Sequence, residues 1–462
     1  MKIHLISPPT TLKERYGDVI SKVTGNVPPL GILYISAVLK QNGFEVSVID
    51  GSKYDYKKMI SKVKKESPDV VGISCLTFTW NKVKKLAEDI KSEVPSSFIV
   101  VGGPHPTVLK RKCLEESPFI DAAVVGEGEY TTLDLVNCLK FKKKLKNVKG
   151  LIFRNNGVIK ENEQRSLIKN LDRLPFPDRK AVDILSYIPA LEEYKELPMT
   201  HMISSRGCPF QCIYCSKING NIIRFRSSQN IIKEIEELIS DYKLKEIQFH
   251  DDTFTANRKR VIEFIKLLRK NEIDVSWSVN SRIDTVDRKL LLEMKNSGCW
   301  KMFFGVESMI QKNLNTIKKY IKLKQIFNVI KWCKEIGIES ECSFMFGLPG
   351  ESYKDAIRTI NKIIELDPDY AIFFAITPFP ETELFNNIKK YGKVISNNWD
   401  DYTTHKIVFT PYTMTKNEIQ SLISLAYKKF YLRPKYLIKE IKKIKSLGVI
   451  KKYLRCCHRQ YY

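Results

Sequence analysis

The sequence predicts an α/β protein in which an N-terminal doubly wound, Rossmann-like parallel sheet is followed by a partial (βα)6 barrel and a C-terminal helical tail. Three observations lead to this prediction. Residues 1–150 alternate short β-branched runs with amphipathic helical patterns, a proline-rich stretch interrupts the alternation, and six further βα units follow. Six units suit a partial barrel better than the eight units of a closed one.

The composition is that of a globular protein. The chain has 462 residues, of which 43% are hydrophobic and 28% are charged. Its 11 cysteines are scattered and odd in number, and neither a signal peptide nor an apolar run of about 18 residues is seen, so we expect a reducing cytosolic location. The formal charge of +25 indicates an acidic partner, such as nucleic acid, anionic lipid or a phosphorylated substrate, without choosing between them.

The first part of the sequence reads as five strands separated by helical patterns. The expected strands are "KIHLISP", "FEVSVID", "VVGISC", "FIVVGG" and "AAVVGEGE". In a doubly wound sheet the ligand lies beyond the carboxyl ends of the strands. Glycines let the backbone approach a bulky ligand closely, and the alternative is that they only form tight turns. The residues at that edge are Pro8, Pro9, Ser74, Gly102, Gly103, Pro104, Gly126, Glu127 and Gly128.

Two prolines mark the change to the second αβ alternation. Pro175 and Pro177 break any regular element, so we expect the sheet domain at residues 1–150 and a linker at 151–195. The six later strands, from "MISSRG" to "AIFFAITP", place the barrel at 196–395 and the helical tail at 396–462. Barrel enzymes build their sites where the strands end. The polar residues expected at that rim are Cys208, Asp251, Asp252, Asn280, Arg282, Glu307 and Ser308.

Three closely spaced thiols follow the first barrel strand. The segment "SSRGCPFQCIYCSK" contains Cys208, Cys212 and Cys215, and the nearest candidate fourth ligand, His201, lies on the predicted strand. Structural zinc prefers four protein ligands, whereas three soft thiolates suit a cubane iron-sulfur cluster that keeps one iron open to an external ligand. The alternative, three buried structural cysteines, is disfavoured by this spacing at the mouth of a predicted barrel.

These residues resemble the radical S-adenosylmethionine enzymes. The spacing of the three cysteines, with Tyr214 before the last, is similar to the cysteine motif of that family, and the likeness extends over roughly the whole barrel. The resemblance implies a 4Fe-4S cluster held by the three thiolates, whose open iron chelates S-adenosylmethionine and whose electron cleaves it to a 5′-deoxyadenosyl radical. It also implies contacts to S-adenosylmethionine from Tyr214, Asp251, Asp252, Asn280, Arg282, Glu307 and Ser308.

The N-terminal part narrows the resemblance. "PPLGILYISAVLKQNGFEVSVIDG", "VGGPHPT" and "VVGEGEYT" resemble the cobalamin-binding domain of a subgroup that includes methyltransferases and an anaerobic magnesium-protoporphyrin ester cyclase. No Asp-x-His-x-x-Gly occurs, and only His105 lies on the predicted edge, so a cobalamin here would lack a protein histidine ligand. Another departure is Met309, where relatives often have glycine. The implied cobalamin contacts are Pro8, Ser74, Gly102, Gly103, Gly126 and Glu127.

The resemblance implies an enzyme that methylates an unactivated carbon of its substrate. A ring-forming or oxidising radical reaction on a hydrophobic or porphyrin-like substrate is the closest alternative. A methylthiotransferase acting on RNA ranks well below, because that family usually has three further cysteines in its first domain, and Cys75, Cys113 and Cys138 have an unsuitable spacing. Nucleic acid is therefore disfavoured as a partner. The family implies a small-molecule or lipid-like substrate and an electron donor such as flavodoxin or ferredoxin.

Some of these residues have simpler structural interpretations. Asp251 and Asp252 are also placed to cap the following helix, and Glu307 to pair with Arg282 across neighbouring strand ends. His250 is more often a rim or core histidine than a ligand. The cysteines outside the triad that lie in apolar surroundings, and so read as core residues, are Cys75, Cys113, Cys138, Cys299, Cys333 and Cys342.

The tail is strongly basic. Residues 428–459 contain twelve Lys or Arg side chains against one acid, Glu440, interleaved with apolar residues. The pattern favours a helix packed against the barrel, and it leaves open a peripheral contact of the tail with an anionic membrane.

Overall fold

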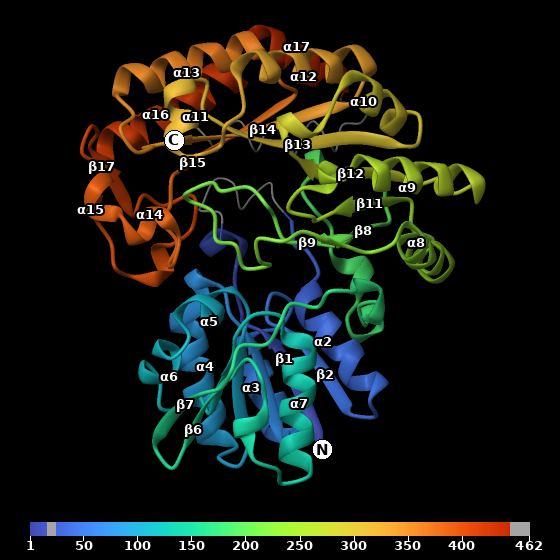
Figure 1. Ribbon diagram of the computed structural model, residues 1–462, viewed down its shortest axis with the longest axis vertical. Coiled ribbons are helices and arrows are strands. Elements are labelled where there is room, and N and C mark those ends of the chain that lie inside the picture. The colour runs from blue at the N-terminus through green and yellow to red at the C-terminus, as the bar shows by residue number, and fades with distance from the viewer. Residues whose placement is uncertain (16–24, 444–462) are drawn as a thin grey trace.

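The first domain is built on a sheet whose five parallel strands are those predicted. The computed structural model describes residues 1–15 and 25–443, and within them this sheet has seven strands in the order β2-β1-β3-β4-β5-β6-β7 (Figure 1). The parallel strands are β1 (Lys2–Ser7), β2 (Glu45–Asp50), β3 (Val70–Ser74), β4 (Phe98–Gly102) and β5 (Ala122–Val124). Their order turns back at β1, as a doubly wound sheet requires.

Helices cover both faces of this sheet. On one face lie α2 (Leu30–Gln41) and α7 (Gly128–Lys140), which pack their apolar side chains with those of β1 and β5. On the other lie α3 (Tyr56–Glu66) and α4 (Trp80–Glu93), together with α6 (Lys112–Glu115). The short helix α5 (Pro104–Leu109) follows β4 at the carboxyl edge. Burial on both faces explains the continuous apolar runs of the strands.

The sheet continues past residue 150, where the sequence led us to expect a linker. Strands β6 (Leu151–Asn155) and β7 (Val158–Glu161) form an antiparallel hairpin on β5. Asn156 and Gly157 turn the hairpin with φ of 48° and 79°, as the Asn-Gly pair of a two-residue turn allows. This Asn-Gly pair between two β-rich runs is the signal that the linker prediction overlooked.

The barrel contains six parallel strands, and five of them lie where they were predicted. The first, predicted at "MISSRG", lies earlier, because Ser205–Arg206 pair antiparallel with Arg224–Phe225 instead. Their order is β15-β14-β13-β12-β11-β8, so the sheet stays open between β8 and β15. The strands are β8 (Met199–Met202), β11 (Glu246–Phe249), β12 (Ser276–Ser281), β13 (Cys299–Glu307), β14 (Glu339–Phe346) and β15 (Tyr370–Ala375).

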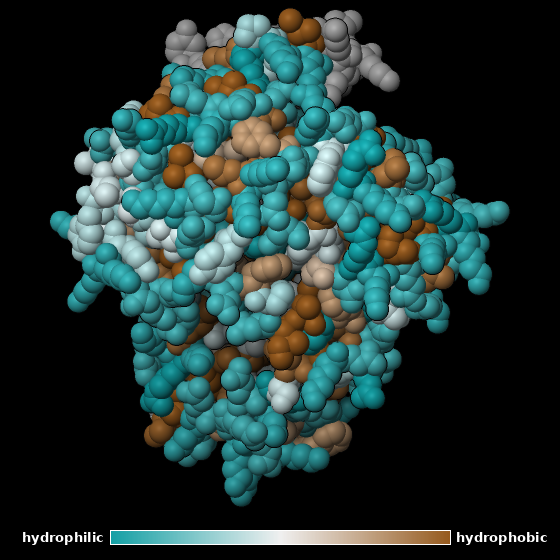
Figure 2. Space-filling model, turned by 45° about the horizontal axis from the view of Figure 1, so that its top comes forward, coloured by the Kyte–Doolittle hydropathy of each residue, from teal (hydrophilic) through white to brown (hydrophobic). Residues whose placement is uncertain are grey.

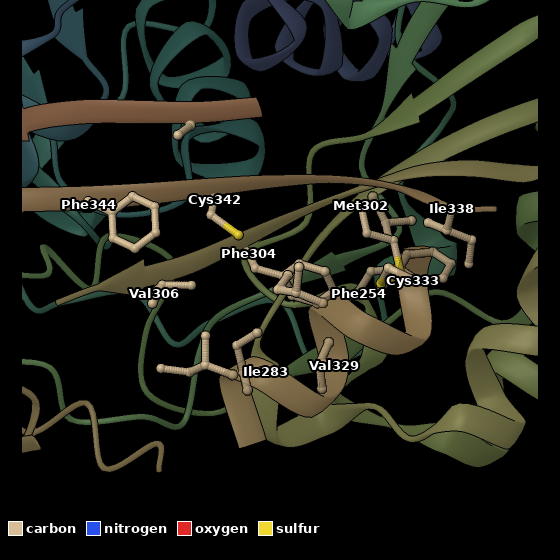
Figure 3. Packing of buried hydrophobic residues seen from close by; sticks show 14 of the residues in the cluster. Phe254, Ile283, Met302, Phe304, Val306, Val329, Cys333, Ile338, Cys342 and Phe344 are labelled. Atoms are coloured by element: carbon tan, nitrogen blue, oxygen red, sulfur yellow. The ribbon is translucent and has the colours of Figure 1, made fainter. Parts of the chain in front are cut away.

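Helices form the outer layer of the barrel and enclose its main core. They are α8 (Ser228–Tyr242), α9 (Arg258–Lys270), α10 (Arg288–Lys295), α11 (Gln311–Thr316), α12 (Leu323–Ile336) and α13 (Tyr353–Leu366). Figure 3 shows Cys333 and Cys342 packed among Phe304, Met302 and Val329 in this core. The predicted core role of Cys75, Cys113, Cys299, Cys333 and Cys342 is confirmed, and Cys138 is half-buried beside the first sheet.

The tail is not entirely helical. After α14 (Glu383–Asn386) and α15 (Ile388–Tyr391), strands β16 (Gly392–Val394) and β17 (Phe409–Pro411) pair antiparallel, and helices α16 (Lys416–Tyr431) and α17 (Pro434–Lys443) follow. Phe430 and Tyr436 join the barrel core, while Arg433 and Lys435 bind Asp367 at 2.9 and 2.7 Å. The described part of the basic segment therefore packs against the barrel, and the rest of it, from residue 444, lies outside the described residues.

No helix among residues 1–15 and 25–443 has the length and apolar character needed to cross a membrane. Figure 2 shows that hydrophilic side chains cover most of the face in view, where hydrophobic residues appear in separate groups.

Candidate active site

The three predicted cluster ligands lie on one loop between two short paired strands. We call residues 207–223 the cysteine loop, and it connects β9 (Ser205–Arg206) to β10 (Arg224–Phe225), which pair antiparallel. Cys212 is buried, Cys208 half-buried and Cys215 exposed, and none of the three forms a disulfide. Gly207 opens the loop with φ of 94°, and a Cβ there would lie 2.4 Å from a backbone oxygen, so only glycine fits.

Arg282 holds the cysteine loop from the end of β12. Its guanidinium lies 3.6 Å from the ring centre of Phe210 and 3.8 Å from the Cys212 Sγ atom. Two parallel hydrogen bonds of 2.9 Å to Asp284 fix the orientation of the guanidinium. Iron is bound by thiolates, and the positive guanidinium lies where it can offset their negative charge. Arg282 is therefore placed to support the cluster ligands.

A second contact joins the loop to the end of β13. The Tyr214 hydroxyl donates to Glu307 Oε1 at 3.1 Å, and Lys319 pairs with the same oxygen at 3.0 Å. Glu307 has a positive φ of 74°, an unusual backbone conformation that aims the carboxylate at these partners. The suggested pairing of Glu307 with Arg282 is wrong, because Glu307 forms its ion pair with Lys319 and Arg282 forms its ion pair with Asp284.

The donor set of the loop fits an iron-sulfur cluster. Partial burial and the two neighbouring thiols together raise the pKa of Cys215 to about 12, because adjacent thiolates repel one another when no cation lies between them. A cationic cluster removes that repulsion, and thiolates are its preferred ligands. Within residues 1–15 and 25–443, no three His, Cys, Asp or Glu side chains converge as ligands of a single metal ion.

A cavity of about 460 Å³ separates the sheet edge from the barrel rim. We call it the interdomain cavity. Its sheet wall includes Ser74, Gly102, Gly103, Gly126 and Glu127, as predicted for a ligand at the carboxyl edge. Its barrel wall includes Ser216 and Asn219 of the cysteine loop and, beyond β11, His250 and Asp252. The cavity thus reaches from the predicted cobalamin edge to the loop that carries the cysteines.

Several predicted site residues do not face this cavity. Asp251 is fully buried and accepts hydrogen bonds from the Ser204 backbone N–H at 2.6 Å and from the Ser205 hydroxyl at 2.7 Å. Asp251 does not cap the next helix either, because Asn257 caps α9. Ser308 is also fully buried and accepts from the Ile310 backbone N–H at 3.2 Å. Asp251 and Ser308 therefore stabilise the segments that follow the barrel strands and do not form part of the cavity wall.

Three other predicted residues lie in different surroundings. Pro8 is buried beside Gly51 and is not part of the cavity wall. Asn280 is half-buried near the end of β12. Asp252 faces the cavity, and the Asn219 amide donates to its Oδ2 atom at 3.4 Å.

Of His105 and His250, it is His250 that lines the cavity, at the barrel rim as the sequence suggested. His105 is fully buried between Trp80 and Trp399, with ring centres 5.0 and 5.4 Å away, and it does not line the interdomain cavity. His250 does line the cavity, and its ring packs against His201 at 4.4 Å. Partial loss of the water around the ring lowers the pKa of His250 to about 4, so the ring is neutral at ordinary pH.

Family models match the two domains separately. The B12 binding domain model matches residues 16–136, and the Radical SAM superfamily model matches residues 202–363. The first match covers most of the parallel sheet, and the second covers the cysteine loop and strands β11–β14.

Relatives resemble the chain over most of its length. An uncharacterized methyltransferase from Pyrococcus horikoshii is 36% identical, over 100% of this chain and 99% of its own. An anaerobic magnesium-protoporphyrin IX monomethyl ester cyclase from Rubrivivax gelatinosus is 28% identical, over 95% of this chain and 79% of its own.

A solved structure shares the fold. The radical S-adenosylmethionine methyltransferase TsrM from Kitasatospora setae, solved with cobalamin and an iron-sulfur cluster, superposes with a TM-score of 0.68. It is 17% identical, over 91% of this chain and 80% of that one.

Proposed function

The chain belongs to the radical S-adenosylmethionine enzymes that carry a cobalamin-binding domain, and we propose that it methylates an unactivated carbon of a small-molecule substrate. The enzyme uses a 4Fe-4S cluster, S-adenosylmethionine and cobalamin. One observation carries the proposal: a single cavity is bordered by the glycine-rich sheet edge on one side and by the cysteine loop on the other. Groups held on the two walls are near enough to act on one substrate.

When bound, the cluster and S-adenosylmethionine supply the radical that removes hydrogen, and cobalamin supplies the methyl group. In this proposal Cys208, Cys212 and Cys215 ligate the cluster, and Arg282 and Tyr214 keep their loop in place. Asp252, on the cavity wall, and Asn280, near the end of β12, are both placed for polar contacts to S-adenosylmethionine. The two walls together exclude water, which radical chemistry requires.

The sheet edge is the proposed cobalamin seat. Ser74, Gly102, Gly103 and Gly126 present backbone and small side chains to the cavity, which leaves room for a large flat ring. An electron donor such as flavodoxin or ferredoxin would reduce the cluster. The proposed substrate is a small or lipid-like molecule, and the proposed location is cytoplasmic.

A cyclase-like reaction is the second candidate. It is favoured by the similarity to the cyclase of Rubrivivax gelatinosus, which spans 95% of this chain. The two candidates share the radical step and differ in whether cobalamin delivers a methyl group.

The products of S-adenosylmethionine separate the candidates. We would purify the protein anaerobically, rebuild the cluster, and add hydroxocobalamin, S-adenosylmethionine and a low-potential reductant. A methyltransferase should form both 5′-deoxyadenosine and cobalamin-dependent S-adenosylhomocysteine, since the methyl group leaves S-adenosylmethionine for cobalamin. Formation of 5′-deoxyadenosine alone would contradict methylation and favour the cyclase, and formation of neither product would contradict both.

A further inference from the structure

Glu127 was predicted to contact cobalamin, but its carboxylate is already occupied by the barrel. It follows β5 and precedes α7 at the sheet edge. Arg206 Nη1 donates to it at 3.0 Å, Arg224 Nη1 donates to both of its oxygens at 2.8 Å, and the Ile168 backbone N–H donates at 2.7 Å. All three charged side chains are at most 10% exposed. The carboxylate therefore binds two arginines that lie far away in the sequence.

The two arginines stand at the two ends of the cysteine loop. Arg206 is the last residue before the loop and Arg224 the first after it, and the two pair directly across β9 and β10. Arg224 also donates to the Asn219 carbonyl, within the loop, at 2.7 Å. The Cys208 backbone N–H donates to the Gly220 carbonyl at 3.2 Å, so the loop is closed just above the arginines. The base of the cysteine loop is thus attached to the cobalamin domain through the Glu127 carboxylate, which holds both arginines.

Glu129 links the same attachment to the interdomain cavity. Its Oε1 atom accepts from Arg206 Nη2 at 2.5 Å, so Arg206 is shared between Glu127 and Glu129. Glu129 is 4% exposed and lines the cavity, and its Oε2 atom has no hydrogen-bond partner. A buried carboxylate oxygen without a donor is costly, so it is poised to accept one from a ligand. Cobalamin carries several primary amides around its ring, each of which can donate.

We propose that Glu127, Glu129, Arg206 and Arg224, here called the charge cluster, couple cobalamin binding in the interdomain cavity to the geometry of the cysteine loop. An amide that binds Glu129 Oε2 fixes the carboxylate whose other oxygen holds Arg206. Arg206 and Glu127 then fix the base of the loop on which the cluster and S-adenosylmethionine bind. Cobalamin and S-adenosylmethionine should therefore bind with positive cooperativity, and each should raise the affinity for the other by the same factor.

Because the charge cluster is buried, separating its ion pairs costs much free energy, so its members should move together. If Glu127 moved away, Arg224 would be left without a counter-charge and Arg206 would keep only Glu129, and an unpaired buried charge is strongly unfavourable. The contact to Glu129 and Glu127 raises the pKa of the Arg206 guanidinium despite its burial, so Arg206 stays charged. Glu127 and Arg206 act here as positioning residues.

The coupling is measured as a ratio of affinities. The protein with its rebuilt, oxidised cluster is dialysed to equilibrium against labelled S-adenosylmethionine, with and without saturating hydroxocobalamin, and the reciprocal titration follows cobalamin absorbance. No turnover occurs in this state, so the result rests on the cofactors alone and not on the proposed methylation. In the wild type, cobalamin should lower the dissociation constant of S-adenosylmethionine by about fivefold or more, the lower range of ordinary coupling.

Glu127→Gln should bring this ratio close to one, since a neutral amide cannot hold both arginines. The matched control is Glu234→Gln, because Glu234 is equally buried and pairs with Arg179 at 2.9 Å and Arg226 at 2.5 Å without touching the cobalamin domain. The control should keep the wild-type ratio. A ratio near one in the wild type, or an unchanged ratio in Glu127→Gln, would overturn the proposal.

A second variant covers the case in which Glu127→Gln does not fold. Glu129→Met removes the free oxygen and leaves Arg206 bound to Glu127, so the chain should still assemble. It should weaken hydroxocobalamin binding and lower the ratio. Full cooperativity in Glu129→Met would refute the coupling, whereas a wild-type protein that binds no cobalamin at all would instead refute the cofactor assignment.

Discussion

The two walls of the interdomain cavity are built by different means. The sheet wall offers glycines and the small Ser74, whereas the barrel wall offers the cysteine loop, His250 and Asp252. All glycines of the cavity wall lie on the sheet side, among apolar side chains such as Tyr34 and Val124 and the carboxylates of Glu127 and Glu129. The barrel wall has mostly polar side chains. The difference indicates that glycines, which lack side chains, leave room for a large cofactor, whereas a radical centre depends on side chains held in fixed positions. The predictions below test each wall in turn.

The largest effect is expected on the barrel wall. Replacing Cys208, Cys212 and Cys215 together with alanine should abolish binding of the cluster, because no other thiol lies on the loop. Iron and sulfide content, and the electron paramagnetic resonance signal after reduction, measure the loss. Cobalamin binding on the opposite wall should remain. Cys138→Ala, which changes a half-buried thiol outside the loop, serves as the control and should keep the full signal.

The support of the cysteine loop should be the next most sensitive feature. Lys319→Met leaves the buried Glu307 carboxylate without its cation, which should destabilise the protein by about 3–5 kcal/mol. Urea unfolding of the cluster-free protein measures this. Lys318→Met is the matched control, because the neighbouring Lys318 forms an exposed pair with Glu383 and its loss should leave the free energy of unfolding nearly unchanged. Equal costs for the two variants would show that Glu307 does not depend on Lys319.

The glycine-rich wall could be predicted from sequence, because glycine is chosen for its own backbone freedom. The same holds for the cysteine triad, whose spacing is local. The pairing of Glu127 could not be predicted, because its partners, Arg206 and Arg224, are 79 and 97 residues away. No local pattern reveals that the carboxylate is already paired.

The directions of the side chains after β11 could not be predicted for a different reason. Successive side chains of an extended segment point to opposite sides. His250 and Asp252 are exposed toward the cavity, and Asp251 between them is fully buried. The sequence placed all three at the strand end but could not tell which side faced the cavity. Only the register with the neighbouring strands decides that.

Adding a single methyl group to a glycine of the sheet wall should change stability or cobalamin affinity. Gly103 and Gly126 both have positive φ, of 108° and 84°. A Cβ at Gly103 would lie 2.9 Å from the Cys75 carbonyl oxygen, whereas a Cβ at Gly126 would meet nothing within 4 Å. Gly103→Ala should therefore destabilise the fold by about 1–3 kcal/mol. Gly126→Ala should cost less in unfolding experiments and act mainly on hydroxocobalamin affinity, since its methyl group enters the cavity.

The last prediction concerns His105, which lies on α5 outside the cavity wall and contacts Trp399 in the C-terminal part of the chain. His105 is held between Trp80 and Trp399 in the neutral form, since burial, with a smaller contribution from Lys84, lowers its pKa to about 3. The unfolded chain binds a proton near pH 6.5, so the folded state binds fewer protons below that pH and loses stability as the pH falls. At pH 5 the difference of about 1.5 pH units corresponds to about 2 kcal/mol.

His105→Phe keeps an aromatic ring between the two tryptophans and removes the proton-binding group. Its free energy of unfolding, relative to the wild type, should therefore rise by about 2 kcal/mol when the pH is lowered from about 7.5 to about 5. The other buried histidines are present in both proteins, so their contributions cancel in this comparison. Urea unfolding at the two pH values measures the change. An equal loss of stability in both proteins would mean that His105 binds a proton in the folded state as readily as in the unfolded chain. That result would contradict the neutral form of His105 between the two tryptophans.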